Sequence, residues 1–89
     1  MANKRSLKKE INLVCESLMA ECVAVTLYGP EEKKESASDL FHSVMEMGDH
    51  FLSRVSYPEP GIAPKAYYKD LREKFASQAG EIIDQINNH

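Results

Sequence analysis

The sequence contains no stretch in which apolar and polar residues alternate with a period of two between turn residues. That alternation is the pattern of a half-buried β-strand, so its absence excludes a sheet. The chain also has no internal repeat and no low-complexity tract. Its 89 residues suffice for one modest hydrophobic core. We therefore expect an all-α protein with a single domain over residues 1–89.

The motifs that usually carry chemistry are also missing. There is no glycine-rich phosphate loop, no nucleophile elbow and no Cys/His cluster with zinc-site spacing. General acid–base catalysis would need two converging carboxylates, and Glu16 and Glu21 lack the three- or four-residue spacing of helical neighbours. We predict no catalytic residue and no cofactor, and expect a protein that is not an enzyme.

Cysteine is scarce. Cys15 and Cys22 are seven residues apart on one predicted helix, which separates their Cα atoms by about 10 Å, too far for a disulfide. Two reduced cysteines on an apolar face are typical of core packing in a cytoplasmic protein, with a redox or metal role as the alternative. No apolar signal-peptide region follows the basic start. The composition indicates neither disorder nor a membrane span.

The longest apolar-rich stretch runs from Leu7 to Leu27. At about 100° per residue, seven of its side chains fall on one face: Leu7, Ile11, Val14, Cys15, Leu18, Cys22 and Val25. Met19 and Val23 widen this face to roughly 180°, so two partner helices are needed. The helix is predicted over residues 6–28, with Ser6 as its N-cap after a polar tail of residues 1–5. Gly29, in a left-handed C-cap conformation, and Pro30 would end it.

Two further helices are predicted, over residues 37–56 and 64–87. The helix over residues 37–56 has an apolar face formed by Ala37, Leu40, Phe41, Val44, Met45, Met47, Phe51, Leu52 and Val55. Gly48 lies on that face and is interpreted as a packing notch. Residues 31–36 are either a loop or an exposed first turn begun by Pro30. The helix over residues 64–87 has an apolar stripe formed by Tyr68, Leu71, Phe75, Ala79, Ile82, Ile83 and Ile86.

Residues 57–63 form a proline-rich connection between these helices, too long for a helix-turn-helix motif. Short connections favour an up-down-up three-helix bundle, in which the outer two helices pack on the middle one and on each other. Tyr57, Tyr67 and Tyr68 gather near the connection. We expect them to close one end of the bundle, with a partner site as the alternative, and expect Tyr68 to belong to the core.

A second, narrower apolar stripe lies on the back of the first helix, at Leu13, Ala20, Ala24 and Leu27. A monomeric bundle would leave it in water. Two leucines flanking two alanines would let the same helix of a second copy approach closely about a two-fold axis. This stripe is the predicted homodimer interface. Since alanine is also a good helix former, chance placement on a solvent face is the alternative.

Two other sets of residues carry weaker hypotheses. His42, Glu46 and His50 are of metal-ligand type, but the histidines are about 12 Å apart along the helix, so a solvated face is preferred over a weak metal site. A basic cluster comprises Lys4, Arg5, Lys8 and Lys9. It opposes the dipole of the first helix and could meet a phosphate-bearing partner.

The net charge of −3 disfavours general nucleic-acid or anionic-membrane binding. We therefore expect a small cytoplasmic bundle of bacterial type that acts as a non-enzymatic protein-interaction or self-association module. The alternatives are a nucleic-acid or anion-binding accessory domain that uses the basic cluster, and a protein with a metal site on its second helix.

Overall fold

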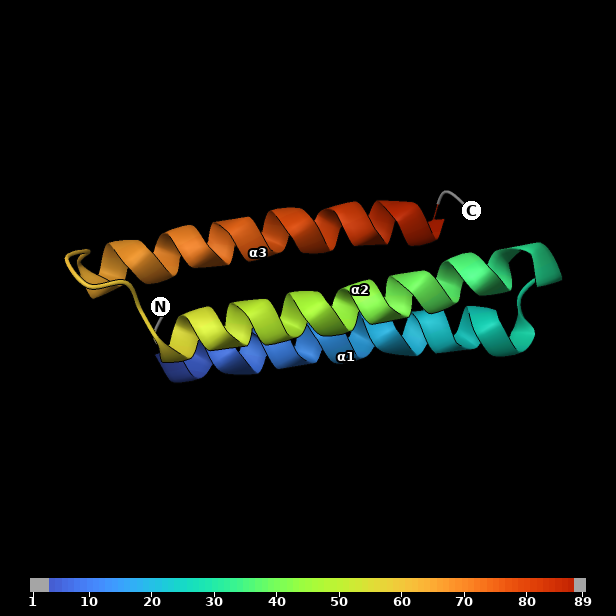
Figure 1. The fold of residues 1–89 in the computed structure, drawn as a ribbon, viewed down its shortest axis with the longest axis horizontal. Helices are drawn as coiled ribbons and strands as arrows, with labels where there is room; N and C mark the ends of the chain where they lie inside the picture. The colour runs from blue at the N-terminus through green and yellow to red at the C-terminus, as the bar shows by residue number, and fades with distance from the viewer. Residues whose placement is uncertain (1–3, 88–89) are drawn as a thin grey trace.

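The computed structural model describes residues 4–87, which form three α-helices. These are α1 (Lys4–Tyr28), α2 (Glu31–Ser56) and α3 (Pro64–Asn87). They run up, down and up (Figure 1), and no strand occurs within this described range. The predicted all-α three-helix bundle is confirmed.

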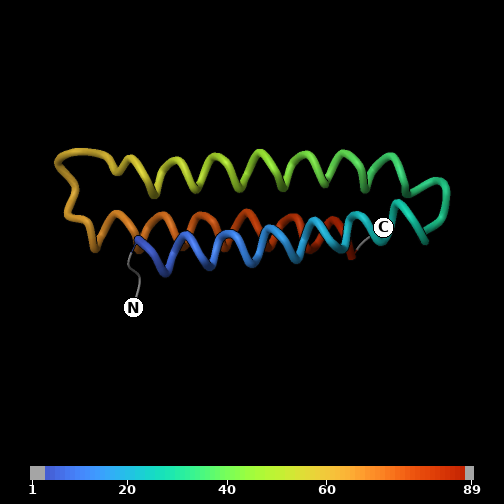
Figure 2. Tube along the Cα trace, turned by 90° about the horizontal axis from the view of Figure 1, so that it is seen from below, coloured from blue at the N-terminus to red at the C-terminus, as the bar shows by residue number. Residues whose placement is uncertain are grey.

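The three helices lie side by side in a rod that measures 49 × 20 × 18 Å. α3 runs antiparallel to α2 and is shifted along the rod, so the turn between α1 and α2 extends beyond its C-terminal end (Figures 1 and 2). We call the part of the rod that contains residues 57–63 the elbow half, and the part that contains the α1–α2 turn the turn half.

The closest helix pair is α1 with α2. Gly48 of α2 is buried there, and a Cβ atom at this position would lie 3.2 Å from the Sγ atom of Cys15 on α1. The predicted packing notch is therefore confirmed: the missing side chain leaves room for a cysteine of the neighbouring helix.

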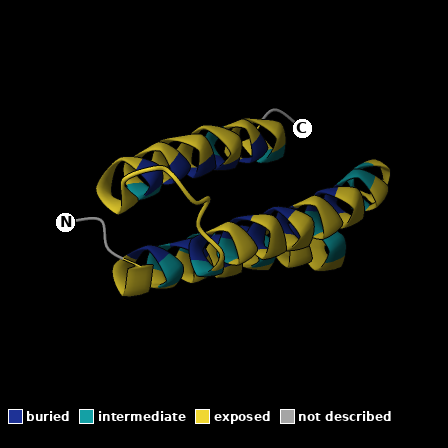
Figure 3. Ribbon diagram, turned by 60° about the vertical axis from the view of Figure 1, so that its left-hand side comes forward, coloured by how far each residue is buried: buried dark blue, intermediate teal, exposed yellow. Residues whose placement is uncertain are grey.

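The core is built from the faces that the three helices turn toward one another (Figure 3). Its main cluster contains Leu7, Ile11, Cys15, Leu18, Val44, Met47, Phe51, Val55, Tyr67, Leu71, Phe75, Ala79 and Ile82. Three residues predicted for the apolar faces, Val23, Met45 and Ile83, are exposed instead. They lie at the edges of their faces, and three helices cover only the centre of each face.

The first helix starts earlier than predicted. α1 already includes Lys4 and Arg5, so Ser6 lies inside the first turn and is not its N-cap. Lysine and arginine are good helix formers, and no glycine or proline separates them from the apolar face, so the helix extends into the expected tail. Residues 1–3 of that tail lie outside the described range.

The second helix also starts earlier, at Glu31 instead of residue 37. Of the two alternatives for residues 31–36, the exposed first turn is correct. Pro30 precedes it with extended backbone angles, φ −60° and ψ 147°. Glu31 and Glu32 occupy the first turn, where negative charge favours the helix dipole.

Gly29 does not adopt the left-handed conformation predicted for it. Its N–H donates to the carbonyl oxygen of Val25 at 2.8 Å, and a Cβ atom here would lie 2.6 Å from that oxygen. Close approach of the backbone therefore requires this glycine. The positive φ belongs to Gly61 in the connection, at 90°.

Two tyrosines close the elbow end of the core. The Tyr67 hydroxyl donates to the carbonyl oxygen of Arg54 at 2.8 Å, and the Tyr68 hydroxyl to that of Val55 at 3.5 Å. Tyr68 packs against the core as predicted. Tyr67, which was not predicted to be part of the apolar stripe, is the more buried of the two. Tyr57 is exposed and does not contribute to this closure.

α1 differs from the other two helices in composition. It contains an 18-residue stretch long and apolar enough to cross a membrane, a test that a mostly buried core helix of a soluble protein and an N-terminal signal sequence also pass. Only 22% of that stretch is buried in the bundle. α1 therefore carries more apolar surface than α2 and α3 cover.

Candidate interaction surface

The predicted interface residues share one side of α1. We call Leu13, Ala20, Ala24 and Leu27 the outer face of α1. All four are exposed, Leu13 to 59% and Leu27 to 63%. At about 100° per residue they point away from Ile11, Leu18 and the rest of the buried face. The bundle thus leaves two leucines and two alanines together in solvent.

Further exposed apolar groups border this face on both sides. On the side toward α2, Val23 is the helical neighbour of Leu27, and Met45 projects from α2. On the side toward α3, Leu13 and Ile83 line a groove of about 370 Å³. Apolar periodicity predicted Val23, Met45 and Ile83 to be core residues. In the sequence, the only indication that these three residues border a surface is their position at the edges of the apolar arcs.

The metal-ligand candidates lie one helical turn apart along α2. His42, Glu46 and His50 are all exposed on α2. Each histidine ring makes an edge contact with the phenylalanine beside it in the sequence: His42 with Phe41, and His50 with Phe51. Within residues 4–87, no group of three or more His, Cys, Asp or Glu side chains is placed to hold a metal ion.

The basic cluster occupies the first two turns of α1. Lys4, Arg5 and Lys9 are exposed and Lys8 is half-buried. No acidic residue lies in the first turn of this helix to balance the dipole.

One ion pair links this end of α1 to α3. The Nε atom of Arg72 lies 3.2 Å from a carboxylate oxygen of Glu10. The pair shows that the first half of α3, which contains Lys65 and Lys69, lies at the same end of the rod as the basic start of α1.

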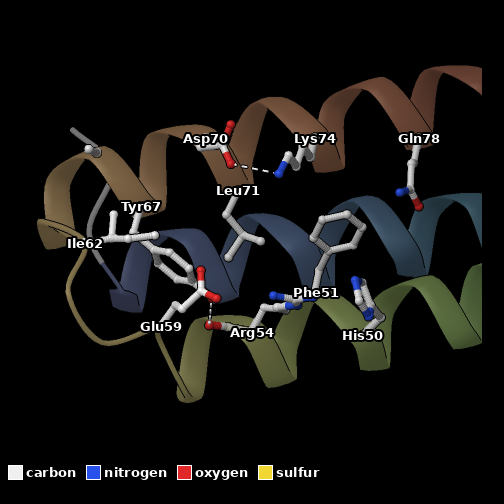
Figure 4. Close-up of a pocket in the computed structure, with 11 residues that line it drawn as sticks. His50, Phe51, Arg54, Glu59, Ile62, Tyr67, Asp70, Leu71, Lys74 and Gln78 are labelled. Atoms are coloured by element: carbon white, nitrogen blue, oxygen red, sulfur yellow. Dashed lines mark hydrogen bonds and ion pairs between the residues drawn. The ribbon is translucent and has the colours of Figure 1, made fainter.

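A cleft of about 460 Å³ lies between α2 and α3 in the elbow half (Figure 4). Phe51, Tyr67 and Leu71 form its apolar floor. Its rim carries both charges, with Arg54 on α2 and a 3.0 Å ion pair between Asp70 and Lys74 on α3. The cleft was not predicted from the sequence because its walls come from two helices and the connection.

The chemistry offered by the cleft is limited. Asp70 is engaged by Lys74 in the next turn of α3, whereas the second acid of the lining, Glu59, comes from the connection. The lining also contains His50, but no serine, threonine or cysteine that a base could activate. The lining can contact a small polar molecule.

The two cysteines are free and buried. Burial raises the pKa of the Cys15 thiol, and the negative charge of Asp49 raises it further. Burial also raises the pKa of the Cys22 thiol, with a smaller contribution from Glu21. Both groups therefore stay protonated at neutral pH and are poor nucleophiles and metal ligands.

No protein-family model matches the chain, and neither the curated proteins nor the solved structures include a significant match. The function is therefore inferred from the geometry described above.

Proposed function

We propose that this protein is a non-enzymatic helical interaction module that self-associates through the outer face of α1. The exposure of Leu13 and Leu27 is the observation that carries the proposal. Burying a leucine side chain stabilises an association by about 1.5–3 kcal/mol. A two-fold dimer would bury Leu13 and Leu27 of both copies.

The small residues between the leucines also support the proposal. Ala20 and Ala24 add no bulk, so a second helix can approach to an interaxial distance of about 8 Å, the close end of the usual range. Val23 and Met45 would extend the buried area toward α2. The proposal places the protein in the cytoplasm, where the free thiols of Cys15 and Cys22 would remain reduced.

Sedimentation at micromolar concentration tests the proposal. We expect the parent chain to sediment as a dimer, and the double variant Ala20→Glu, Ala24→Lys to sediment as a 10.0 kDa monomer with an unchanged helical circular dichroism spectrum. Two long charged side chains in the middle of the contact would have to be desolvated, and their bulk would prevent the close helix approach that the alanines allow.

The matched control is Ser77→Glu, Gln85→Lys, which makes the same changes of charge at exposed positions of α3. It should leave the dimer intact. A monomeric parent would refute the proposal. A dimer that survives the α1 variant would place the contact on another surface.

A second candidate function is binding of a nucleic acid or another polyanion at the elbow half. The location of Lys4, Arg5, Lys8 and Lys9 at the same end of the rod as Lys65 and Lys69 of α3 favours it. Such binding would weaken steeply as salt is added, because each phosphate contact releases counterions. Titration of labelled DNA and RNA across a salt series distinguishes the two candidates: absence of binding at low salt would eliminate the second.

A further inference from the structure

Charge is distributed unequally along the rod. The elbow half, residues 4–14 and 49–74, contains nine lysines and arginines and five acidic residues. The turn half, residues 15–48 and 75–87, contains two lysines and nine acidic residues. The molecule is therefore positive at one end and negative at the other, although its net charge is only −3.

The two ends act as separate charges. The rod is 49 Å long, whereas charges in 0.15 M salt are screened over about 8 Å. A neighbouring molecule therefore meets either a positive or a negative end, and its orientation decides whether like or opposite charges face each other.

Charge reaches the outer face of α1 at both ends. Lys9 lies one turn before Leu13 on the same side of the helix, and Arg5 one turn before Lys9. Beyond Leu27 the chain turns into α2, whose first five residues carry three exposed glutamates, Glu31, Glu32 and Glu35. Two half-buried lysines, Lys33 and Lys34, lie among them, and Lys34 is 3.2 Å from Glu31, so this end keeps a net negative charge of one. Parallel packing of two such faces would bring like charges together at both ends, and antiparallel packing would pair opposite charges at both ends.

We propose that two copies pack antiparallel through α1, with the two-fold axis at Ala20. This proposal rests on the proposed function and adds the orientation and register of the contact. Ala20 is the midpoint between Leu13 and Leu27, so an axis there places each Leu13 opposite Leu27 of the second copy. The same register brings Lys9 to the level of the α1–α2 turn of the second copy, where Glu31 begins α2.

Disulfide trapping tests the orientation. Leu13→Cys and Leu27→Cys chains are oxidised separately and as a mixture, with the parent as the control for its buried Cys15 and Cys22. Antiparallel packing leaves two copies of Leu13 about 21 Å apart along the axis, because they are separated by fourteen residue rises. We expect a covalent dimer in the mixture and none from either chain alone.

Charge reversal tests the electrostatic contribution. Arg5→Glu, Lys9→Glu should weaken dimerisation about tenfold at low salt and much less at 0.5 M salt. This variant removes positive charge from the start of α1, so it should stabilise the helix and cannot act by unfolding it. Adding Glu31→Lys and Glu35→Lys to the same chain restores opposite charges in an antiparallel pair and should recover the parent affinity.

The matched control is Arg54→Glu, Lys74→Glu. It changes the charge of the elbow half by the same amount at the cleft between α2 and α3, to which α1 contributes no residue, and should leave dimerisation within about twofold.

The outcomes separate the two proposals. A monomeric parent refutes both. A dimer in which Leu13→Cys crosslinks with itself refutes the antiparallel orientation and leaves self-association standing. If the variant with all four substitutions (Arg5→Glu, Lys9→Glu, Glu31→Lys and Glu35→Lys) does not recover the parent affinity, the charge pairing is refuted.

Discussion

Leucines of α1 have opposite environments although they are close in sequence. Leu18 is 4% exposed and belongs to the core, whereas Leu13, five residues earlier, is 59% exposed. Five residues correspond to about 500°, so the two side chains point about 140° apart. The same substitution should therefore have different consequences at these two positions.

Replacing Leu18 with Asp should abolish cooperative thermal unfolding. An unpaired carboxylate in this core costs about 4 kcal/mol or more, and a domain of this size is stable by only about 5–10 kcal/mol. Differential scanning calorimetry measures the loss. Ser17→Asp, one residue away and exposed, is the control and should melt within a few degrees of the parent. An unchanged melting temperature for the Leu18 variant would contradict the helix register.

The buried thiols make stability depend on pH in the alkaline range. Their pKa values are raised in the folded protein, so the unfolded chain loses these protons first. The contribution of the two thiols to the free energy of unfolding is fully present below the ordinary thiol pKa of about 8.5. It decreases as the pH rises toward the higher pKa of the folded state. Urea unfolding between pH 7 and 10 should show this decrease, and Cys15→Ala, Cys22→Ala should reduce it. An identical pH dependence in that variant would show that other groups cause the decrease.

At the level of the helices, the contact between α1 and α2 depends on small side chains. Gly48 faces Cys15 across the interface, whereas a Cβ atom added to Gly80 of α3 would meet no other group within 4 Å. Both glycines lie inside helices, where glycine is disfavoured by about 1 kcal/mol relative to alanine. Only Gly48 has a packing reason to be retained.

The two glycines should therefore respond in opposite directions. Gly48→Val should destabilise the protein by roughly 1–3 kcal/mol, because the added methyl groups overpack the notch against α1. Gly80→Ala should stabilise it by about 0.5–1 kcal/mol through helix propensity alone. Chemical denaturation of both variants measures the difference. A stabilising Gly48→Val would mean that the helices can move apart at no cost.

In the whole molecule the helices are unequally spaced: α1 and α2 form a closely packed pair, and α3 packs more loosely on both. The turn half extends beyond the end of α3 (Figure 1). The apolar groove beside Leu13 and the cleft beside Phe51 both lie along α3. Local opening of the bundle should therefore begin with this helix.

Native-state hydrogen exchange tests this expectation. Amides of α3 should exchange faster than those in the centres of α1 and α2, because fewer close contacts must be broken to expose them. Amides around Gly48 and Cys15, at the close contact between α1 and α2, should be among the slowest. Equal protection of all three helices would indicate that the bundle opens only as one cooperative unit.

Apolar periodicity in the sequence alone determined the number of helices, the role of Gly48 and the central core residues such as Ile11, Val44 and Phe75. The prolines of residues 57–63 determined the position of the connection. These features depend on which side of a helix a residue occupies, and that follows from spacing along the chain. The exposed stripe of Leu13, Ala20, Ala24 and Leu27 was predictable for the same reason.

Other features were decided only by the tertiary structure. Whether Val23, Met45 and Ile83 are buried depends on how far the neighbouring helices extend over the edges of each face. The cleft beside Arg54 and the separation of charge along the rod arise because residues distant in sequence, such as Glu10 and Arg72, become neighbours. Periodicity describes one helix at a time, and these properties belong to the way three helices are placed together.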